Sequence, residues 1–342
     1  MFDFEIHLLK TWQVNARGEL LHFLIPALIL IALSALYYFC VNRSVRDRSW
    51  PNLREFIFPR TVFSHASCRI DMMMISLSAL LWRPLISVVT STLVGTNVRR
   101  ALNAYLGSDA PMLHSPLLIL TVQAFTWLLS IQFAFYVMHR LAHTTEWLWR
   151  FHRVHHSSEA LNFMTAGRIH PLEPLFFDIP ISLTSGVALG LLLHFTGVPL
   201  SSALPATEAI LLVVRGVANS IHHSHFAQSF GKLDYVFVSA RMHQIHHSVE
   251  LRHRDRNFGG FLSIYDWVLG TLYLPGKDEK FRVGLNENEL GERNSHQRLR
   301  DCYLEPFGFH GQRLSRSQAP NGQRDMIPPD LSFTPVGAEI AP

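Results

Sequence analysis

Three segments of the chain are apolar enough, and long enough, to cross a membrane. Residues 20–41, 117–138 and 179–198 contain no Asp, Glu, Lys or Arg. A helix rises about 1.5 Å per residue, so about 20 such residues cover a hydrocarbon core of about 30 Å. The pattern therefore predicts a transmembrane helix in each segment.

Two further segments are apolar but interrupted. Residues 72–94 contain Arg83-Pro84, which predicts a kinked span, and residues 203–220 contain Glu208 and Arg215. Together the five segments predict an all-α fold, a polytopic membrane helix bundle with about four to five spans. Residues 95–115, which include Gly107, are expected to form a loop.

Arginines give the bundle an orientation. Five follow the first span: Arg43, Arg46, Arg48, Arg54 and Arg60. Basic residues mark the cytoplasmic side. Counting crossings from there places residues 139–173 and the chain after residue 220 on the cytoplasmic face, in a bacterial inner membrane or the endoplasmic reticulum.

Composition agrees with a membrane protein. Apolar residues make up 48% of the 342 residues and charged residues only 16%, against about 25% in soluble domains. A net charge of +4 gives no indication of nucleic-acid binding. The three cysteines form no Cys-x-x-Cys pair, which excludes a zinc ribbon or a thiol redox pair.

The chemistry of the chain lies in its 20 histidines. The pattern His-x-x-His-His-Ser-x-Glu occurs twice, at residues 152–159 and 243–250. A pair separated by four residues, His139 and His143, comes just before the first copy. The segment Ile221-His-His-Ser-His225 comes before the second. All four clusters are expected at the same membrane surface.

These spacings suit metal ligation. Side chains at i and i+4 of a helix share a face, and neutral imidazole binds iron, zinc and copper. Adjacent histidines diverge by about 100°, so each doublet suits two ions side by side. The candidate ligands are His139, His143, His152, His155, His156, His222, His223, His243, His246 and His247. Glu159 is a candidate hydrogen-bond partner of a ligand. The roles of Glu250 and His170 stay open.

Three of these clusters are histidine boxes: His139-x-x-x-His143, His152-x-x-His155-His156 and His243-x-x-His246-His247. In this order and after a membrane span, they resemble the fatty acid hydroxylase superfamily, also called the sterol desaturase family. Trp149-Arg-Phe-His-Arg-Val-His-His-Ser, Arg168-x-His-Pro, Asn257-Phe-Gly and Tyr265-Asp-Trp also match. The resemblance covers about residues 115–275. Ser157-Ser158-Glu159 is similar to the alkylglycerol monooxygenase branch.

This resemblance implies a membrane oxygenase with two iron ions, or zinc as purified, that uses O₂ to hydroxylate or desaturate a C–H bond of a lipid. It implies the box histidines as ligands, with one or more histidines before the third box. The sequence does not decide whether His222 or His223 is that ligand, and His225 stands where the family has asparagine. The electron donor is expected to be a separate protein of cytochrome b5, ferredoxin or reductase type. The oligomeric state is not indicated.

Two other classes compete with this interpretation. A membrane zinc hydrolase of the zincin type needs a glutamate next to its first histidine, where this chain has Arg140. A metal transporter would hold its ligands near the middle of the spans, and a haem protein needs fewer histidines.

The sequence divides into three parts. Residues 1–116 are expected to form an N-terminal membrane segment, residues 117–275 the catalytic domain, and residues 276–342 a polar tail that is disordered from about residue 312. Residues 257–274 are expected to pack under the metal site.

Overall fold

The computed structural model is mainly helical, and its described residues are 25, 28–36, 38–39, 50–78, 91–107, 112–201, 204–276, 279–285 and 295–308. Within these ranges there is no β-strand, and only two isolated bridges occur, Phe237–Leu262 and Ser248–Val283. The all-α prediction is therefore confirmed.

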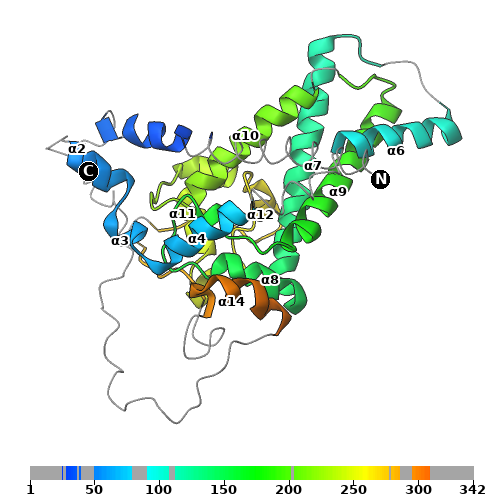
Figure 1. Ribbon diagram of the computed structural model, residues 1–342. Helices are drawn as coiled ribbons and strands as arrows, with labels where there is room; N and C mark the ends of the chain where they lie inside the picture. The colour runs from blue at the N-terminus through cyan, green and yellow to red at the C-terminus, as the bar shows by residue number, and fades with distance from the viewer. Residues whose placement is uncertain are drawn as a thin grey trace, which may run out of the picture.

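The main helices are α2 (Trp50–Ile57), α3 (Arg60–Phe63), α4 (Ala66–Leu77), α6 (Ser91–Leu106), α7 (Pro116–Thr144), α8 (Glu146–His156), α9 (Glu173–Phe195), α10 (Leu204–His222), α11 (Ala240–His246), α12 (Ile264–Val268) and α14 (Leu299–Leu304). Short 3-10 turns are η2 (Thr165–Gly167), η3 (Gly231–Tyr235), η4 (Leu251–His253), η5 (Ser295–Gln297) and η6 (Glu305–Phe307). Helices α7 and α9 project from a body formed by α4, α8, α11 and α12 (Figure 1).

Helix α7 is the longest helix described, with 29 residues. It begins where Ser115 accepts a hydrogen bond from the Leu118 N–H and Pro116 occupies the first turn, both favourable at a helix start. Trp127 and Ile131 of α7 pack with Phe177 of α9. The start of α7 meets the end of α9, so the two helices are antiparallel.

Helices α7 and α9 are long and apolar enough to cross a membrane, although only about a third of each apolar window is buried. Large apolar side chains such as Leu117, Phe125 and Phe195 are exposed. A core helix of a soluble protein would bury such side chains, so these surfaces fit lipid better than water.

These two candidate spans confirm that residues 117–138 and most of residues 179–198 are helical, and α10 covers the weaker segment at residues 203–220. Of the span expected at residues 20–41, residues 25, 28–36 and 38–39 are helical, and the rest lies outside the described residues. So does the middle of the one expected at residues 72–94.

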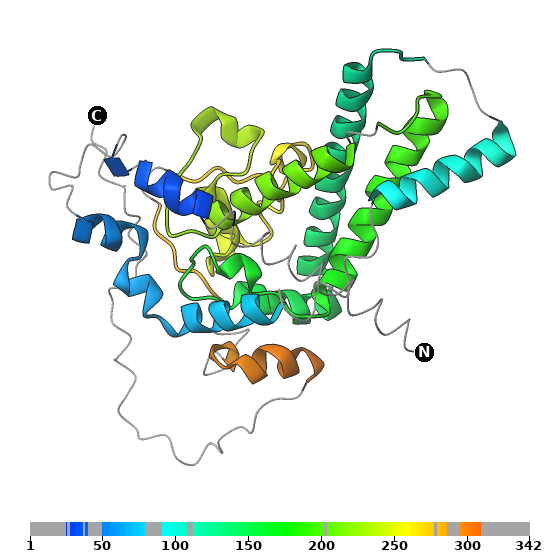
Figure 2. The ribbon, with the colours of Figure 1, turned by 45° about the horizontal axis from the view of Figure 1, so that its top comes forward.

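The expectation of a loop at residues 95–115 is wrong for its first half, because α6 extends to Leu106. Gly107, which suggested the loop, comes only after the last residue of α6. The glycines within the crossing permit close packing instead. A Cβ atom at Gly95 would lie 3.1 Å from the carbonyl oxygen of Gly186 on α9, and one at Gly190 would lie 2.6 Å from the Cβ of Val98. Small residues let α6 cross α9 closely, as Figure 2 shows.

The chain after residue 294 returns to the body. Cys302 of α14 packs against Ile70 and Met74 of α4 and Val154 of α8. The buried Arg168 guanidinium joins the same elements, because it donates to Asp71 at 2.9 Å and to the His296 carbonyl at 2.6 Å. The disorder expected from residue 312 lies outside the described residues.

Candidate metal centre

Four helices deliver the histidines to one place. His139 and His143 lie one turn apart at the end of α7, and α8 carries the first His-x-x-His-His box. Helix α11 carries most of the second box, and the chain just after α10 supplies His223. Because α7 leads into α8 through Thr145 alone, the first two clusters are held against each other by a very short connection.

Nine histidines form two groups, in each of which the potential ligand atoms all lie within 4.8 Å of one another. The first group contains His139, His143, His152, His156 and His246. The second contains His155, His223, His243 and His247. All except His143 are buried. We call them the five-histidine and four-histidine groups.

Each histidine doublet is divided between the two groups. His155 and His156 have rings at 88° to each other, and the rings of His246 and His247 are at 90°. This arrangement agrees with the divergence expected of neighbouring helical residues. The groups touch where the His156 and His247 rings stack with centroids 4.3 Å apart. The doublets therefore link the two groups into one centre.

The inward-facing nitrogens are spaced as ligands of a common ion would be. In the five-histidine group, Nε2 of His156 lies 3.1 Å from that of His143 and 3.2 Å from that of His152. In the four-histidine group, Nε2 of His223 lies 3.0 Å from that of His155 and 2.9 Å from that of His243. Two imidazoles about 2.1 Å from one ion and at right angles to each other would be about 3.0 Å apart.

The outer nitrogens of several rings are fixed by hydrogen bonds. The Nδ1 atoms of four histidines each lie 2.7–2.8 Å from an acceptor: Phe258 O for His139, Glu173 Oε1 for His152, Asn219 O for His223 and Arg256 O for His246. A ring that donates from Nδ1 presents the lone pair of Nε2 inward. Nε2 of His139 and of His246 is buried without a hydrogen-bond partner, so a metal ion would satisfy both.

Burial keeps the imidazoles in the form that binds metals. It lowers the pKa of His223 and of His246 to about 3. Burial, and then the neighbouring imidazoles, hold the pKa values of His155, His156 and His247 well below the usual 6.5. These rings are neutral at pH 7, and a neutral imidazole is a metal ligand.

The remaining candidates lie outside both groups. His222 is buried, but its Nε2 faces the Val238 carbonyl at 2.8 Å, so the structure selects His223 from the adjacent pair. Nε2 of His225 lies 2.9 Å from the Phe56 carbonyl. His170 contacts the Tyr303 carbonyl at 3.2 Å. Glu159 lies 4.0 Å from His65 and reaches neither group.

Sequence reasoning missed the carboxylate that does reach the centre, Glu173. It is 6% exposed, and its Oε1 accepts from His152 Nδ1. The signal was its position two residues after the Pro171 of Arg168-x-His-Pro and six residues before the predicted span at residues 179–198. Only the packing of α9 against α8 brings it to the ring.

The turn at residues 256–259 was also missed in detail, although the segment was expected under the site. Its carbonyls hold the rings of His139 and His246. The Asp266 carboxylate shapes the turn by accepting from the backbone N–H groups of Phe258 and Gly259 at 2.7 Å. Asn257 adopts a left-handed conformation there, with φ of 57°, which asparagine tolerates better than most residues.

A pocket of about 300 Å³ reaches the five-histidine group from the end of α7. His143, His156 and His246 line its inner part, and Trp149 forms part of its wall. Charged residues lie further out, namely Glu146, Glu250, Arg254 and Asp255. The four-histidine group does not line this pocket. The five-histidine group is therefore the part of the centre that a polar pocket approaches.

The same region is similar to known proteins. Residues 124–271 match the model of the fatty acid hydroxylase family. Ornithine lipid hydroxylase from Rhizobium tropici is 33% identical over 159 residues, which are 46% of this chain and 44% of that protein. Alkylglycerol monooxygenase from Homo sapiens is 29% identical over 166 residues, 47% of this chain and 33% of the relative. The Caenorhabditis elegans alkylglycerol monooxygenase is 28% identical over 167 residues, 48% and 30% respectively.

The chain thus spans less than half the length of these curated relatives. No solved structure matches it. The matched region contains all nine histidines of the two groups, together with Glu173 and the turn at residues 256–259.

Proposed function

Because residues 124–271 match the fatty acid hydroxylase family model, we propose that the protein is a membrane-bound two-iron oxygenase that hydroxylates a C–H bond of a lipid. The observation that carries this proposal is the pair of adjacent histidine groups, with five and four converging imidazoles. One ion cannot use nine ligands, whereas two ions with four to six ligands each can. The similar proteins are named as a hydroxylase and a monooxygenase, which favours hydroxylation over desaturation.

The nine histidines would hold the metal ions, with His222 outside the set. Iron fits the family, and zinc also binds imidazole and can replace it in purified protein. A pair of iron ions would supply the activation of O₂ that C–H oxidation needs. The protein's own contribution is to keep the rings neutral, to fix their orientation through Nδ1, and to exclude water.

The orientation of the first-group rings is the clearest of these contributions. The Glu173 carboxylate accepts the His152 Nδ1–H, and the Phe258 carbonyl accepts that of His139. Each bond fixes one tautomer and raises the basicity of the inward nitrogen. Phe177 stacks on the His152 ring at 5.6 Å and restricts its rotation.

The membrane placement follows from the exposed apolar surfaces of α7 and α9. We place the protein as a multi-pass membrane protein with its histidine centre at the cytoplasmic face. The end of α7 that carries His139 is followed by Arg140, Arg150 and Arg153, which supports that side. A lipid in the bilayer and an electron donor in the cytoplasm would both have access to a centre at this level.

The partners proposed are a lipid and a separate electron-donor protein of cytochrome b5, ferredoxin or reductase type. The two electrons of each turnover come from that donor. Ornithine lipids and alkylglycerols are the first substrates to test, because they appear in the names of the relatives.

The test begins with metal content. Protein purified in mild detergent is expected to contain about two irons per chain without a haem Soret band. His246→Ala and His247→Ala remove one ligand from different groups, so each is expected to lower the content toward one. His114→Ala, an exposed histidine outside both groups, is the matched control.

Activity then separates the metal site from the chemistry. Iron-loaded protein with a reducing system and O₂ is expected to add one oxygen atom to a lipid, measured by mass spectrometry with ¹⁸O₂. One metal per chain, or full content in both alanine variants, would contradict the two-metal proposal. Full content without oxygen incorporation into any lipid would contradict the hydroxylase proposal alone.

A further inference from the structure

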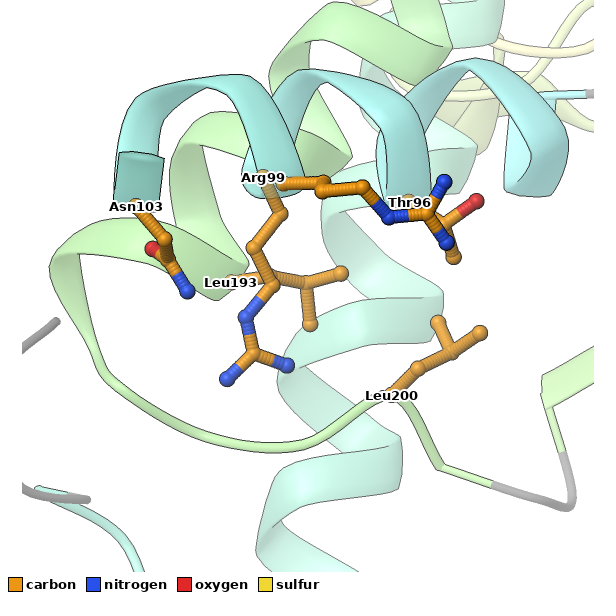
Figure 3. Close-up of a pocket in the computed structure, with 6 residues that line it drawn as sticks. Thr96, Arg99, Asn103, Leu193 and Leu200 are labelled. Atoms are coloured by element: carbon orange, nitrogen blue, oxygen red, sulfur yellow. The ribbon is translucent and has the colours of Figure 1, made fainter. Parts of the chain in front are cut away.

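A second pocket lies far from the five-histidine and four-histidine groups, where α6 crosses the end of α9. It measures about 320 Å³ and is lined by Thr96, Arg99, Arg100, Asn103, Leu193 and Leu200. Figure 3 shows the labelled side chains of α6 on one side of the pocket, with Leu193 and Leu200 facing them. The pocket therefore combines two guanidinium groups with an apolar wall.

Among the described residues, neither arginine has a carboxylate partner. There, Arg99 donates to the Gly197 carbonyl at 3.4 Å, and Arg100 donates to the Asn97 side chain at 3.3 Å. Both contacts are long, and no ion pair of the described residues involves either guanidinium. Two guanidinium groups that line one pocket, each with a long hydrogen bond to a neutral oxygen, favour an anionic ligand.

Polar groups of the pocket are also oriented for an acceptor-rich ligand. His194 Nδ1 lies 2.7 Å from Oδ1 of Asn103. Since that oxygen accepts from the ring, the amide N–H₂ of Asn103 remains as a donor. The Thr96 hydroxyl donates to the Leu93 carbonyl at 3.0 Å, so the Asn103 amide is the neutral donor that the pocket adds to its two cations.

The surroundings show that the ligand belongs to a membrane. Large apolar side chains at this end of the helices are exposed, with Tyr105 at 89%, Leu106 at 69% and Phe195 at 60%. From Pro116 to His139, α7 rises about 35 Å, so the pocket and the histidine centre lie at opposite ends of α7 and α9. That is about the thickness of a hydrocarbon core.

The positive charges of Arg99 and Arg100 are also unusual for the side of the membrane on which they lie. With the histidines at the cytoplasmic face, this end of α9 faces away from the cytoplasm, where basic residues are disfavoured. A pair of arginines there needs a specific reason, and lipid phosphate at the interface supplies one.

We propose that this pocket binds the phosphate of a membrane phospholipid in the leaflet opposite the histidine centre. The two guanidinium groups bind the phosphate oxygens, and Leu193 and Leu200 contact the glycerol and upper acyl carbons. The bound lipid joins α6 to the end of α9. This site depends on the membrane placement and not on the chemistry of the metal centre.

The test is native mass spectrometry of the full chain in nonionic detergent after lipid removal, with added dioleoyl phosphatidylglycerol. One bound lipid is expected. Arg99→Gln/Arg100→Gln should weaken binding by at least about 10-fold, since each charged hydrogen bond contributes about 1.5–3 kcal/mol. The matched control is Arg54→Gln/Arg69→Gln, which removes two exposed arginines elsewhere.

Two further ligands and one further variant decide the interpretation. Dioleoylglycerol, which lacks phosphate, should not compete, and inorganic phosphate should compete only weakly. If the double variant does not fold, the single Arg100→Gln, at an exposed position, replaces it. Equal binding by dioleoylglycerol, or unchanged binding in the arginine variants, would overturn the proposal. Saturation by inorganic phosphate without any gain from the acyl chains would overturn its lipid part.

Discussion

Glu173 is the residue whose single hydrogen bond bears most directly on the proposed centre. Its carboxylate orients His152, which lies in the middle of the five-histidine group. We expect Glu173→Ala to weaken metal binding at that group by about 10–100-fold, the usual effect of losing such a partner. Glu173→Gln keeps an acceptor oxygen and should lose less. The measurement is iron retention against a graded chelator.

The control for this prediction is Glu159→Ala, which removes the carboxylate that sequence reasoning favoured. Glu159 is half exposed and lies beside His65, so metal retention should not change. A larger loss in Glu159→Ala than in Glu173→Ala would restore the original assignment and contradict the geometry.

These two glutamates show what a sequence can and cannot predict about single residues. The box histidines were identifiable because their spacing is local to one helix. Glu173 was not, because its role depends on how α9 packs against α8, about 20 residues from His152 in sequence. The choice between His222 and His223 likewise depends on the direction in which α10 ends, since neighbouring helical residues point about 100° apart.

At the scale of elements, the crossing of α6 and α9 depends on residues without bulk. Gly190→Val would add two methyl groups at a position where even the added Cβ would lie 2.6 Å from the Val98 Cβ. Overpacking of this kind costs about 1–3 kcal/mol, so the thermal midpoint in detergent should fall by several degrees. Val187→Leu, at a 42% exposed position of the same helix, adds bulk without a clash and should leave the midpoint unchanged.

The same crossing explains which helices the sequence predicted. Helices α7 and α9 follow from long uncharged runs, a signal that lies within each segment. Helix α6 was mistaken for a loop because breakers such as Gly107 follow it closely, and the loop that they mark was extended back to Gly95. Its glycine is required by a neighbour 91 residues away in the chain, Gly186, and no local pattern contains that information.

At the scale of the whole molecule, residues 295–308 belong to the body that holds the centre. Removal of residues 309–342 should leave metal content and thermal midpoint unchanged. Removal of residues 295–342 should lower both, because the buried Arg168 would lose the His296 carbonyl and the half-buried Arg153 would lose its ion pair with Glu305. A buried polar group that loses its partner costs about 1–3 kcal/mol. Equal behaviour of the two truncated proteins in a thermal melt and metal analysis would show that the segment is dispensable.

The buried histidines also make the stability of the metal-free protein depend on pH. In the unfolded chain their pKa is about 6.5, whereas burial lowers the folded pKa of His223 and His246 to about 3. Below pH 6.5 the unfolded state therefore binds more protons than the folded state. As the pH is lowered, the free energy of unfolding falls by up to about 1.4 kcal/mol per pH unit for each such histidine. Above pH 7 these groups contribute no slope.

Thermal melts of chelator-treated protein between pH 8 and pH 5 provide the measurement. The midpoint should be constant above about pH 7 and fall steadily below pH 6.5, before most carboxylates titrate. His223→Gln/His246→Gln removes two of the titrating rings and should make the decline shallower. A midpoint that stays constant down to pH 5 would mean that the histidines are accessible to protons in the folded state, which contradicts their burial.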